Sequence, residues 1–249
     1  MSAADVLEIT ALTLRIGLVS TLLILLPGVA LGWVLARREF RGRSLVQTLV
    51  ALPMVLPPVA VGLLLLKLLS RASPVGRAIE SLFGGPILLT WWAAALAAAA
   101  MSFPLLVRGA EAGFAAVPER LEHVARSLGA SRARVLLSIT LPLAARGILH
   151  GVVFAFARGM GEFGATVLVA GHIPGQTETL ALGMYARIEE FRDRDALILA
   201  AVSVALAFAI TYAAESLLRR GAAAPGARRS SANGARATSG AGPGAGAAS

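Results

Sequence analysis

The 249-residue chain contains no cysteine and a single lysine, and both absences restrict its chemistry. Without cysteine it forms no disulfide, no thiolate metal site and no thiol nucleophile. The lysine, Lys67, lies between Leu66 and Leu68 in an apolar run, whereas a P-loop needs a glycine-rich turn that ends in Gly-Lys-Ser/Thr. The chain therefore carries no nucleotide-binding loop of this kind, and any work that it performs with ATP depends on a partner.

Charged residues are also scarce, at 15% of the chain, while hydrophobic residues make up 57% and the mean hydropathy is +0.75. These values exclude an ordinary soluble domain. A helix needs about 20 apolar residues to cross a hydrocarbon core of about 30 Å. Five stretches qualify: residues 12–36, 46–69, 86–107, 144–170 and 196–218. We therefore expect an all-α integral membrane protein of about five spans, with one membrane domain over residues 10–218.

The basic residues are distributed unevenly between the two sides of these stretches. Fifteen of the 23 follow the first, third and fifth stretches, six lie on the opposite side, and Arg15 and Arg158 lie within spans. By the positive-inside rule, the amino terminus is expected outside and the carboxyl terminus in the cytosol. Residues 219–249 are almost entirely Ala, Gly, Ser, Pro and Arg without apolar periodicity, which predicts a disordered cytosolic tail.

The charged segment 110–143 is expected to be a cytosolic loop that contains two short helices. Pro118 suits the first position of a helix, and Gly129 suits the left-handed residue that ends it. Ser131 can cap a second helix. The apolar residues of the first helix recur at helical spacing and form one stripe: Leu121, Val124, Ala125 and Leu128. A short amphipathic helix below a membrane bundle is suited to a groove on a partner protein.

This loop resembles the signature loop of bacterial ABC importer permeases, Glu-Ala-Ala-x3-Gly-x9-Ile-x-Leu-Pro. The matching residues, with every spacing kept, are Ala125, Gly129, Ile139, Leu141 and Pro142. His123 and Val124 stand where the family has Glu and its first Ala, and the adjacent Glu122 lies about 100° around the helix, so it does not simply substitute. The resemblance implies that the loop couples the permease to an ATPase through Leu121, Glu122, His123, Val124, Ala125, Arg126, Gly129 and Ala130.

Four further runs, at residues 52–62, 101–108, 156–166 and 172–180, are similar to the permease subunits of molybdate importers. This resemblance implies a type I ABC importer bundle in a bacterial cytoplasmic membrane, with molybdate or tungstate as the transported anion. It also implies a homodimer, two cytosolic ATPase subunits and an external oxyanion-binding protein. No cofactor, metal, nucleic acid or catalytic residue is expected, because the subunit transports and a partner hydrolyses ATP.

Polar and helix-breaking residues inside the spans are candidates for the translocation route. Prolines break the hydrogen-bond ladder of the second span, and Ser102-Phe103-Pro104 is expected to interrupt the third. Arg158 and Glu162 lie four residues apart in the fourth span, where a charge costs about 2.5–3.5 kcal/mol. The pair either lines the route, with Arg158 offsetting the anion's charge, or neutralises itself between helices. We assign the route or its gate to Pro57, Pro58, Ser102, Arg158, Glu162 and Thr166.

The stretch from residue 172 to 190 is assigned, by analogy, to the outer gate and to docking of the binding protein. Its candidate residues are a turn at Pro174 and Gly175 and two hydroxyl donors, Thr177 and Thr179. A sulfate or thiosulfate importer is the alternative within the class. An intramembrane hydrolase would need a positioned Ser and His, from Ser102, Ser203 and His150, but no glycine-flanked nucleophile motif accompanies them. The loop helix argues against an uncoupled channel or scaffold.

Overall fold

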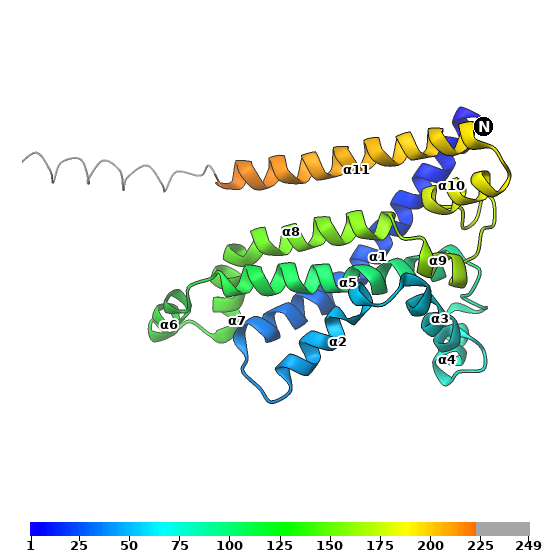
Figure 1. Ribbon diagram of the computed structural model, residues 1–249. Helices are drawn as coiled ribbons and strands as arrows, with labels where there is room; N and C mark the ends of the chain where they lie inside the picture. The colour runs from blue at the N-terminus through cyan, green and yellow to red at the C-terminus, as the bar shows by residue number, and fades with distance from the viewer. Residues whose placement is uncertain (223–249) are drawn as a thin grey trace, which may run out of the picture. The chain divides into compact units, whose positions relative to one another are not determined.

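The computed structural model describes residues 1–222, and every regular element among them is a helix (Figure 1). The longer helices are α1 (Ala3–Arg37), α2 (Arg43–Val55), α3 (Pro58–Leu69), α5 (Trp91–Ala115), α8 (Leu141–Met160) and α11 (Asp193–Ala222). The shorter ones are α4 (Pro74–Phe83), α6 (Glu119–Ser127), α7 (Arg132–Val135), the π-helical turn η1 (Leu136–Thr140), α9 (Gly164–Val169) and α10 (Leu180–Glu189).

Four helical stretches of the described residues are long and apolar enough to cross a membrane: α1, α5, Arg132–Met160 and Asp193–Ser216. The pair α2 and α3 makes a fifth candidate span, bent by 109°. The expected all-α fold with about five spans is therefore confirmed. Residues 219–222 still belong to α11, so the predicted disordered tail is wrong for them, and its remainder, 223–249, lies outside the described residues.

The bend between α2 and α3 follows from the two consecutive prolines. Pro57 and Pro58 have no amide hydrogen to donate, and a residue before proline is disfavoured in the α conformation. Leu56 and Pro57 are accordingly extended, with ψ of 145° and 132°, and α3 begins at Pro58. The interruption expected at Pro104 was wrong: α5 continues through this proline from Trp91 to Ala115.

The fourth expected span is also broken. Helix α8 ends at Met160, and α9 begins at Gly164 after three residues that are not helical. Glycine is a poor helix former, and both Gly159 and Gly161 lie at this end. Glu162 therefore lies in the break and not within one continuous span helix, although its carboxylate still pairs with Arg158, four residues earlier.

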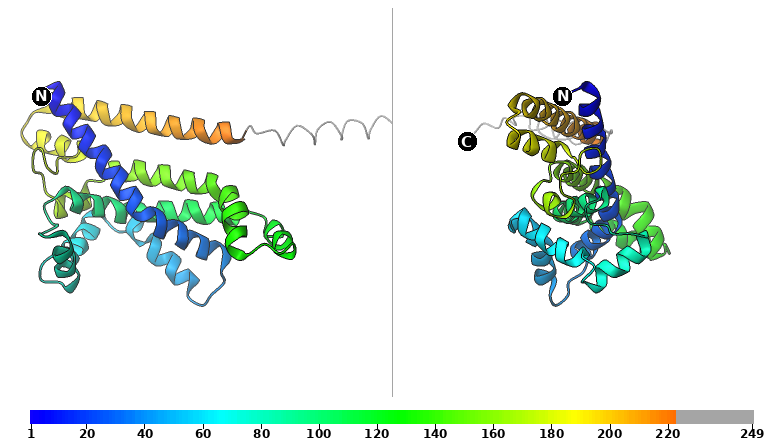
Figure 2. Two further views of the ribbon diagram at one scale, coloured as in Figure 1. Left: turned by 180° about the vertical axis from the view of Figure 1, so that it is seen from behind. Right: turned by 90° about the vertical axis from the view of Figure 1, so that its right-hand side faces the viewer.

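Within the compact unit formed by residues 1–214, α5 packs against both α1 and α8, and Figure 2 shows α1 crossing these two helices. Alanines of α5 fill the contact with side chains that are almost fully buried. A Cβ atom at Gly147 of α8 would lie 2.3 Å from the Cα atom of Gly113 in α5. Only residues without a side chain allow the two backbones to approach this closely.

Candidate functional site

Helix α6 and its flanking turns form the loop for which coupling was predicted. Gly129 has φ +87° and ends the helix in the left-handed region, as expected. The Ser131 hydroxyl accepts a hydrogen bond from the Arg134 amide at 3.3 Å, which confirms the predicted cap of the next helix. Pro118 occupies the capping position before Glu119 rather than the first helical position. Short-range capping chemistry thus produces this helix–turn–helix.

The apolar stripe of α6 is left largely uncovered by the rest of residues 1–222. None of the nine residues of α6 is buried. The side chains of Leu121, Val124 and Leu128 are 46%, 51% and 83% exposed, and Ala125 is half-buried. Isolated exposed apolar residues are common, but a stripe along one face of an amphipathic helix marks a surface for interaction. The stripe is therefore the candidate contact with another protein.

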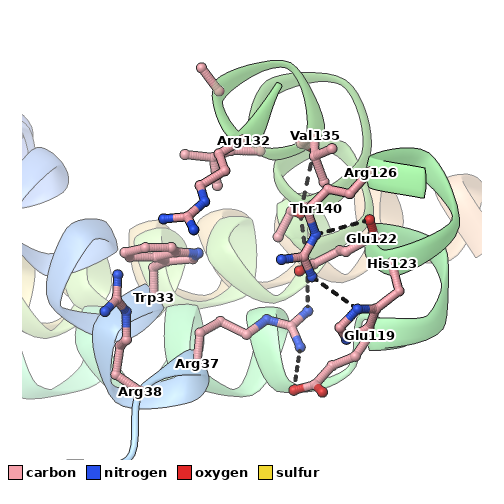
Figure 3. A pocket seen from close by; sticks show the side chains of 12 residues that line it. Trp33, Arg37, Arg38, Glu119, Glu122, His123, Arg126, Arg132, Val135 and Thr140 are labelled. Atoms are coloured by element: carbon pink, nitrogen blue, oxygen red, sulfur yellow. Dashed lines mark hydrogen bonds and ion pairs between the residues drawn. The ribbon is translucent and has the colours of Figure 1, made fainter. Parts of the chain in front are cut away.

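A second face of α6 is fixed to the bundle by Glu122. Its Oε1 atom accepts hydrogen bonds from Arg37 Nη2 at 2.8 Å and from Thr140 Oγ1 at 2.9 Å (Figure 3). Arg37 Nη2 also donates to the Val117 carbonyl at 2.9 Å, and its Nη1 pairs with Glu119 at 3.3 Å. These contacts, which we call the Glu122 lock, connect α6 to the end of α1 and to the beginning of α8.

The remaining residues assigned to coupling lie at the exposed side or the end of the helix. Arg126 Nη2 lies 3.3 Å from His123 Nδ1, and both side chains are exposed. The Ala130 amide donates to the Ala125 carbonyl at 3.1 Å, which closes the turn that contains Gly129. His123 therefore contacts Arg126 and takes no part in the Glu122 lock, although both side chains line the same cavity as Glu122.

The break between α8 and α9 is organised by Glu162. Arg158 Nη1 forms an ion pair with Glu162 Oε2 at 2.7 Å, and Glu162 Oε1 accepts a hydrogen bond from the Ala165 amide at 2.8 Å. The Glu162 side chain is 2% exposed, whereas the Arg158 side chain is 34% exposed. The carboxylate thus accepts a hydrogen bond from the first turn of α9 and pairs with one side of the Arg158 guanidinium, whose side chain remains partly exposed.

The two broken spans meet at their breaks. A Cβ atom at Gly164, the first residue of α9, would lie 2.8 Å from Pro58 Cβ, the first residue of α3. A Cβ atom at Gly62 would lie 2.8 Å from Ala165 Cα. The prolines that bend one span therefore lie beside the chain break of the other, and Pro57 is exposed there. The sequence did not predict that the proline bend of the second span and the break in the fourth span lie side by side.

Two residues assigned to the route lie inside the packed chain instead. Ser102 is fully buried, and its hydroxyl has no hydrogen-bond partner in the described residues. A Cβ atom at Gly159 would lie 3.2 Å from Ser102 Oγ and 3.1 Å from Ser20 Oγ, so this hydroxyl faces the contact of three helices. Thr166 is 1% exposed within α9. Neither side chain reaches an open surface of the chain.

The outer stretch is divided between an exposed tip and buried hydroxyls. Pro174 and Gly175 are exposed, and Gly175 has φ +73°. Thr177 is fully buried and donates to the Gly171 carbonyl at 3.0 Å, and Thr179 caps α10 through the Leu182 amide at 3.3 Å. The two hydroxyls therefore stabilise the loop and are not available as outward donors.

An ion pair that the sequence does not indicate lies below this tip. Arg187 pairs with Glu178, whose Oε1 atom also lies 3.4 Å from His172 Nε2. Both partners of the pair are mostly buried, and they line a cavity of about 220 Å³ with Pro174 and Gly175. His172 and Glu178 lie in the loop before α10, and Arg187 lies in α10. Their spacing in the sequence does not indicate that they are in contact.

The bent and broken spans, the small-residue helix contacts and the exposed loop helix define a membrane-spanning transport subunit. Residues 28–222 match the family "Binding-protein-dependent transport system inner membrane component", and the chain belongs to this family. It is therefore a multi-pass inner-membrane permease component of an ABC transporter and is not itself the ATPase. Membership implies that a separate ATPase and a binding protein are its partners.

Three named relatives are similar to the chain over most of its length. The chain is 42% identical to the molybdenum transport system permease protein ModB of Escherichia coli K12, over 84% of this chain and 91% of the relative. It is 41% identical to ModB of Haemophilus influenzae, over 74% and 81% of the two chains. It is also 41% identical to the molybdate/tungstate permease protein WtpB of Pyrococcus abyssi, over 66% and 60%.

Solved structures support the fold. A bacterial ABC transporter that imports the acidic polysaccharide alginate is similar with a TM-score of 0.67 and 20% identity, over 88% of this chain and 80% of that one. The inward-facing MetNI methionine ABC transporter is similar with a TM-score of 0.62 and 18% identity, over 88% and 99%. These likenesses concern the arrangement of helices, which is that of ABC importer permeases.

Proposed function

We propose that this chain is the permease subunit of an ATP-driven importer of molybdate, with tungstate as an alternative substrate. The observation that carries the proposal is the identity of about 40% to molybdenum permeases, which extends over most of the chain and not only over the loop. The absence of a P-loop from the sequence agrees with a subunit that receives its energy from a partner.

The subunit works as a homodimer with two ATPase copies and an external binding protein. The support for a second copy is the exposure of Arg158, whose side chain is 34% accessible within the membrane-spanning part of the chain. A charge that faced lipid there would cost several kcal/mol, so ionisable residues of spans face protein or water. The face around Arg158 is therefore turned toward the other subunit and the water-filled route between them.

The route passes the adjoining breaks of the second and fourth spans. Arg158 offsets the charge of the oxyanion in transit, and Glu162 positions it from the buried side while capping α9. Pro57 and Pro58 form the neighbouring wall. Because the binding protein supplies the affinity, a weak and transient contact with one arginine suits transport better than a tight site would.

Coupling takes place at α6. The exposed stripe of Leu121, Val124 and Leu128 enters a groove of the ATPase, and the Glu122 lock transmits the displacement of α6 to α1 and α8. Movement of the ATPases thereby opens the route first to the outside and then to the cytosol. The exposed tip at Pro174 and Gly175 provides a docking point for the binding protein on the opposite side.

The substrate is tested in bacteria that lack their own molybdate permease. Expression of this chain with its ATPase and binding protein is expected to restore cellular molybdenum, measured by elemental mass spectrometry after growth in limiting molybdate. The matched control expresses the two partners without this chain. Molybdenum at the control level, in cells where the complex is shown to assemble, would refute the substrate assignment.

A further inference from the structure

A cavity of about 510 Å³ lies between the end of α1 and the coupling loop (Figure 3). We call it the loop cavity. It is separate from the exposed stripe of α6 and from the membrane route. Four arginines line it, together with the ring of Trp33 and the two acidic residues of the loop: Arg37, Arg38, Arg126, Arg132, Glu119 and Glu122. The lining is therefore rich in guanidinium groups.

The two carboxylates of the loop cavity are already engaged by one of these arginines. Arg37 pairs with both Glu119 and Glu122, and Glu122 also accepts from Thr140. Arg38, Arg126 and Arg132 form no ion pair within residues 1–222. The cavity thus has positive charge that its own acidic residues do not neutralise.

A buried donor in the same cavity also lacks a partner. The Arg37 side chain is 9% exposed, and its Nε atom is buried without a hydrogen-bond partner in the described residues. A buried donor left unpaired costs about 1–3 kcal/mol, so such groups are usually satisfied by a ligand or by water. Figure 3 shows the Arg132 and Arg38 side chains directed toward the Trp33 ring, and the Arg38 guanidinium carbon lies 5.9 Å from that ring's centroid.

We propose that the loop cavity binds a tetrahedral oxyanion group. The planar guanidinium donates paired hydrogen bonds that match phosphate geometry, and several such groups converge on one space here. The anion is either the phosphodiester of an anionic lipid headgroup or a free oxyanion in the cytosol. Both fit the arginine-rich end of the bundle, where Trp33 has the position of an interfacial tryptophan.

An oxyanion in this position would connect two parts of the subunit. Arg38 directly follows the last residue of α1, whereas Arg126 and Arg132 belong to the coupling loop. A bound anion shared among them would hold the loop against α1 beside the Glu122 lock. The site would therefore influence how firmly the coupling loop is attached, whichever anion is transported.

The test measures binding to the purified permease–ATPase complex, wild type and with Arg38→Gln, Arg132→Gln or both. Native mass spectrometry counts phosphatidylglycerol bound in competition with phosphatidylcholine, and calorimetry measures sodium phosphate and sodium molybdate. Arg41→Gln is the matched control, because Arg41 is exposed at the same end and does not line the cavity. Both test positions are exposed, and retention of the ATPase verifies assembly.

Loss of the two arginines is expected to weaken binding of one probe about tenfold, with little change in R41Q. A loss for phosphatidylglycerol alone identifies a lipid headgroup, and a loss for phosphate or molybdate identifies a soluble oxyanion. Either result supports the site. If no probe is weakened more by R38Q/R132Q than by R41Q, the proposal is overturned. Because the readout is binding, it does not depend on which anion the complex transports.

Discussion

The substitution Arg158→Gln is expected to lower molybdate uptake roughly ten- to hundredfold, because it removes a charge-assisted contact with the dianion. The guanidinium is held on one side by Glu162 at 2.7 Å and is 34% exposed on the other. Glutamine keeps most of the length of the side chain but not the charge. Uptake is measured in proteoliposomes that contain the assembled complex and its binding protein.

The double variant Arg158→Gln with Glu162→Gln separates a transport role from a purely structural one. In the single variant, the Glu162 carboxylate, whose side chain is 2% exposed, loses its ion-pair partner. Loss of one partner of a buried ion pair destabilises the folded protein by about 3–5 kcal/mol. The double variant removes both charges, and the amide oxygen can still accept from the Ala165 amide. We expect uptake to stay low in the double variant. Recovery to the wild-type rate would show that the pair serves only to neutralise itself.

The second large effect is expected at the exposed stripe of α6. Leu128→Asp places a charge where an apolar side chain, 83% exposed in the isolated subunit, is proposed to enter the ATPase. Burial of a leucine contributes about 1.5–3 kcal/mol, and an unpaired buried charge costs several kcal/mol more. The affinity for the ATPase should therefore fall roughly a hundredfold or more. Co-purification and a binding titration with the ATPase measure it.

Ser127→Asp provides the control for this substitution. Ser127 is adjacent and exposed on the same helix, but it lies about 100° away from Leu128 around the axis. The same charge there should leave ATPase binding within about twofold of wild type, since surface substitutions usually change stability by no more than ±0.5 kcal/mol. Equal losses from both variants would contradict docking through the stripe, and no loss from either would remove α6 from the interface.

The parts of the site that sequence predicted correctly depend on local chemistry. Gly129 ends α6 in the left-handed region, and Ser131 caps the next helix, because these preferences act within a few residues. The bend at Pro57 and Pro58 follows from missing donors in the same way. Spans of the expected number follow from apolar length alone.

The parts that sequence missed depend on contacts between distant segments. The Glu122 lock joins residues 85 positions apart through Arg37, and only the packing of α1 beside the loop brings them together. Pro104 remains helical inside α5, although the second span bends at its prolines, so a proline alone does not decide a break. The inward hydroxyls of Thr177 and Thr179 differ in this respect, because they bond locally, to the Gly171 carbonyl and to the Leu182 amide.

ATP-driven uptake of radiolabelled molybdate into proteoliposomes is the direct test of whether this subunit imports molybdate. The vesicles contain this subunit with its ATPase, the binding protein is added outside, and tungstate and sulfate serve as competitors. We expect molybdate to accumulate only when ATP and all three proteins are present. Tungstate should block this accumulation, and excess sulfate should not. Equal inhibition by sulfate would contradict the assignment to molybdate, and the absence of uptake of any of these oxyanions by a verified complex would contradict the substrate class altogether.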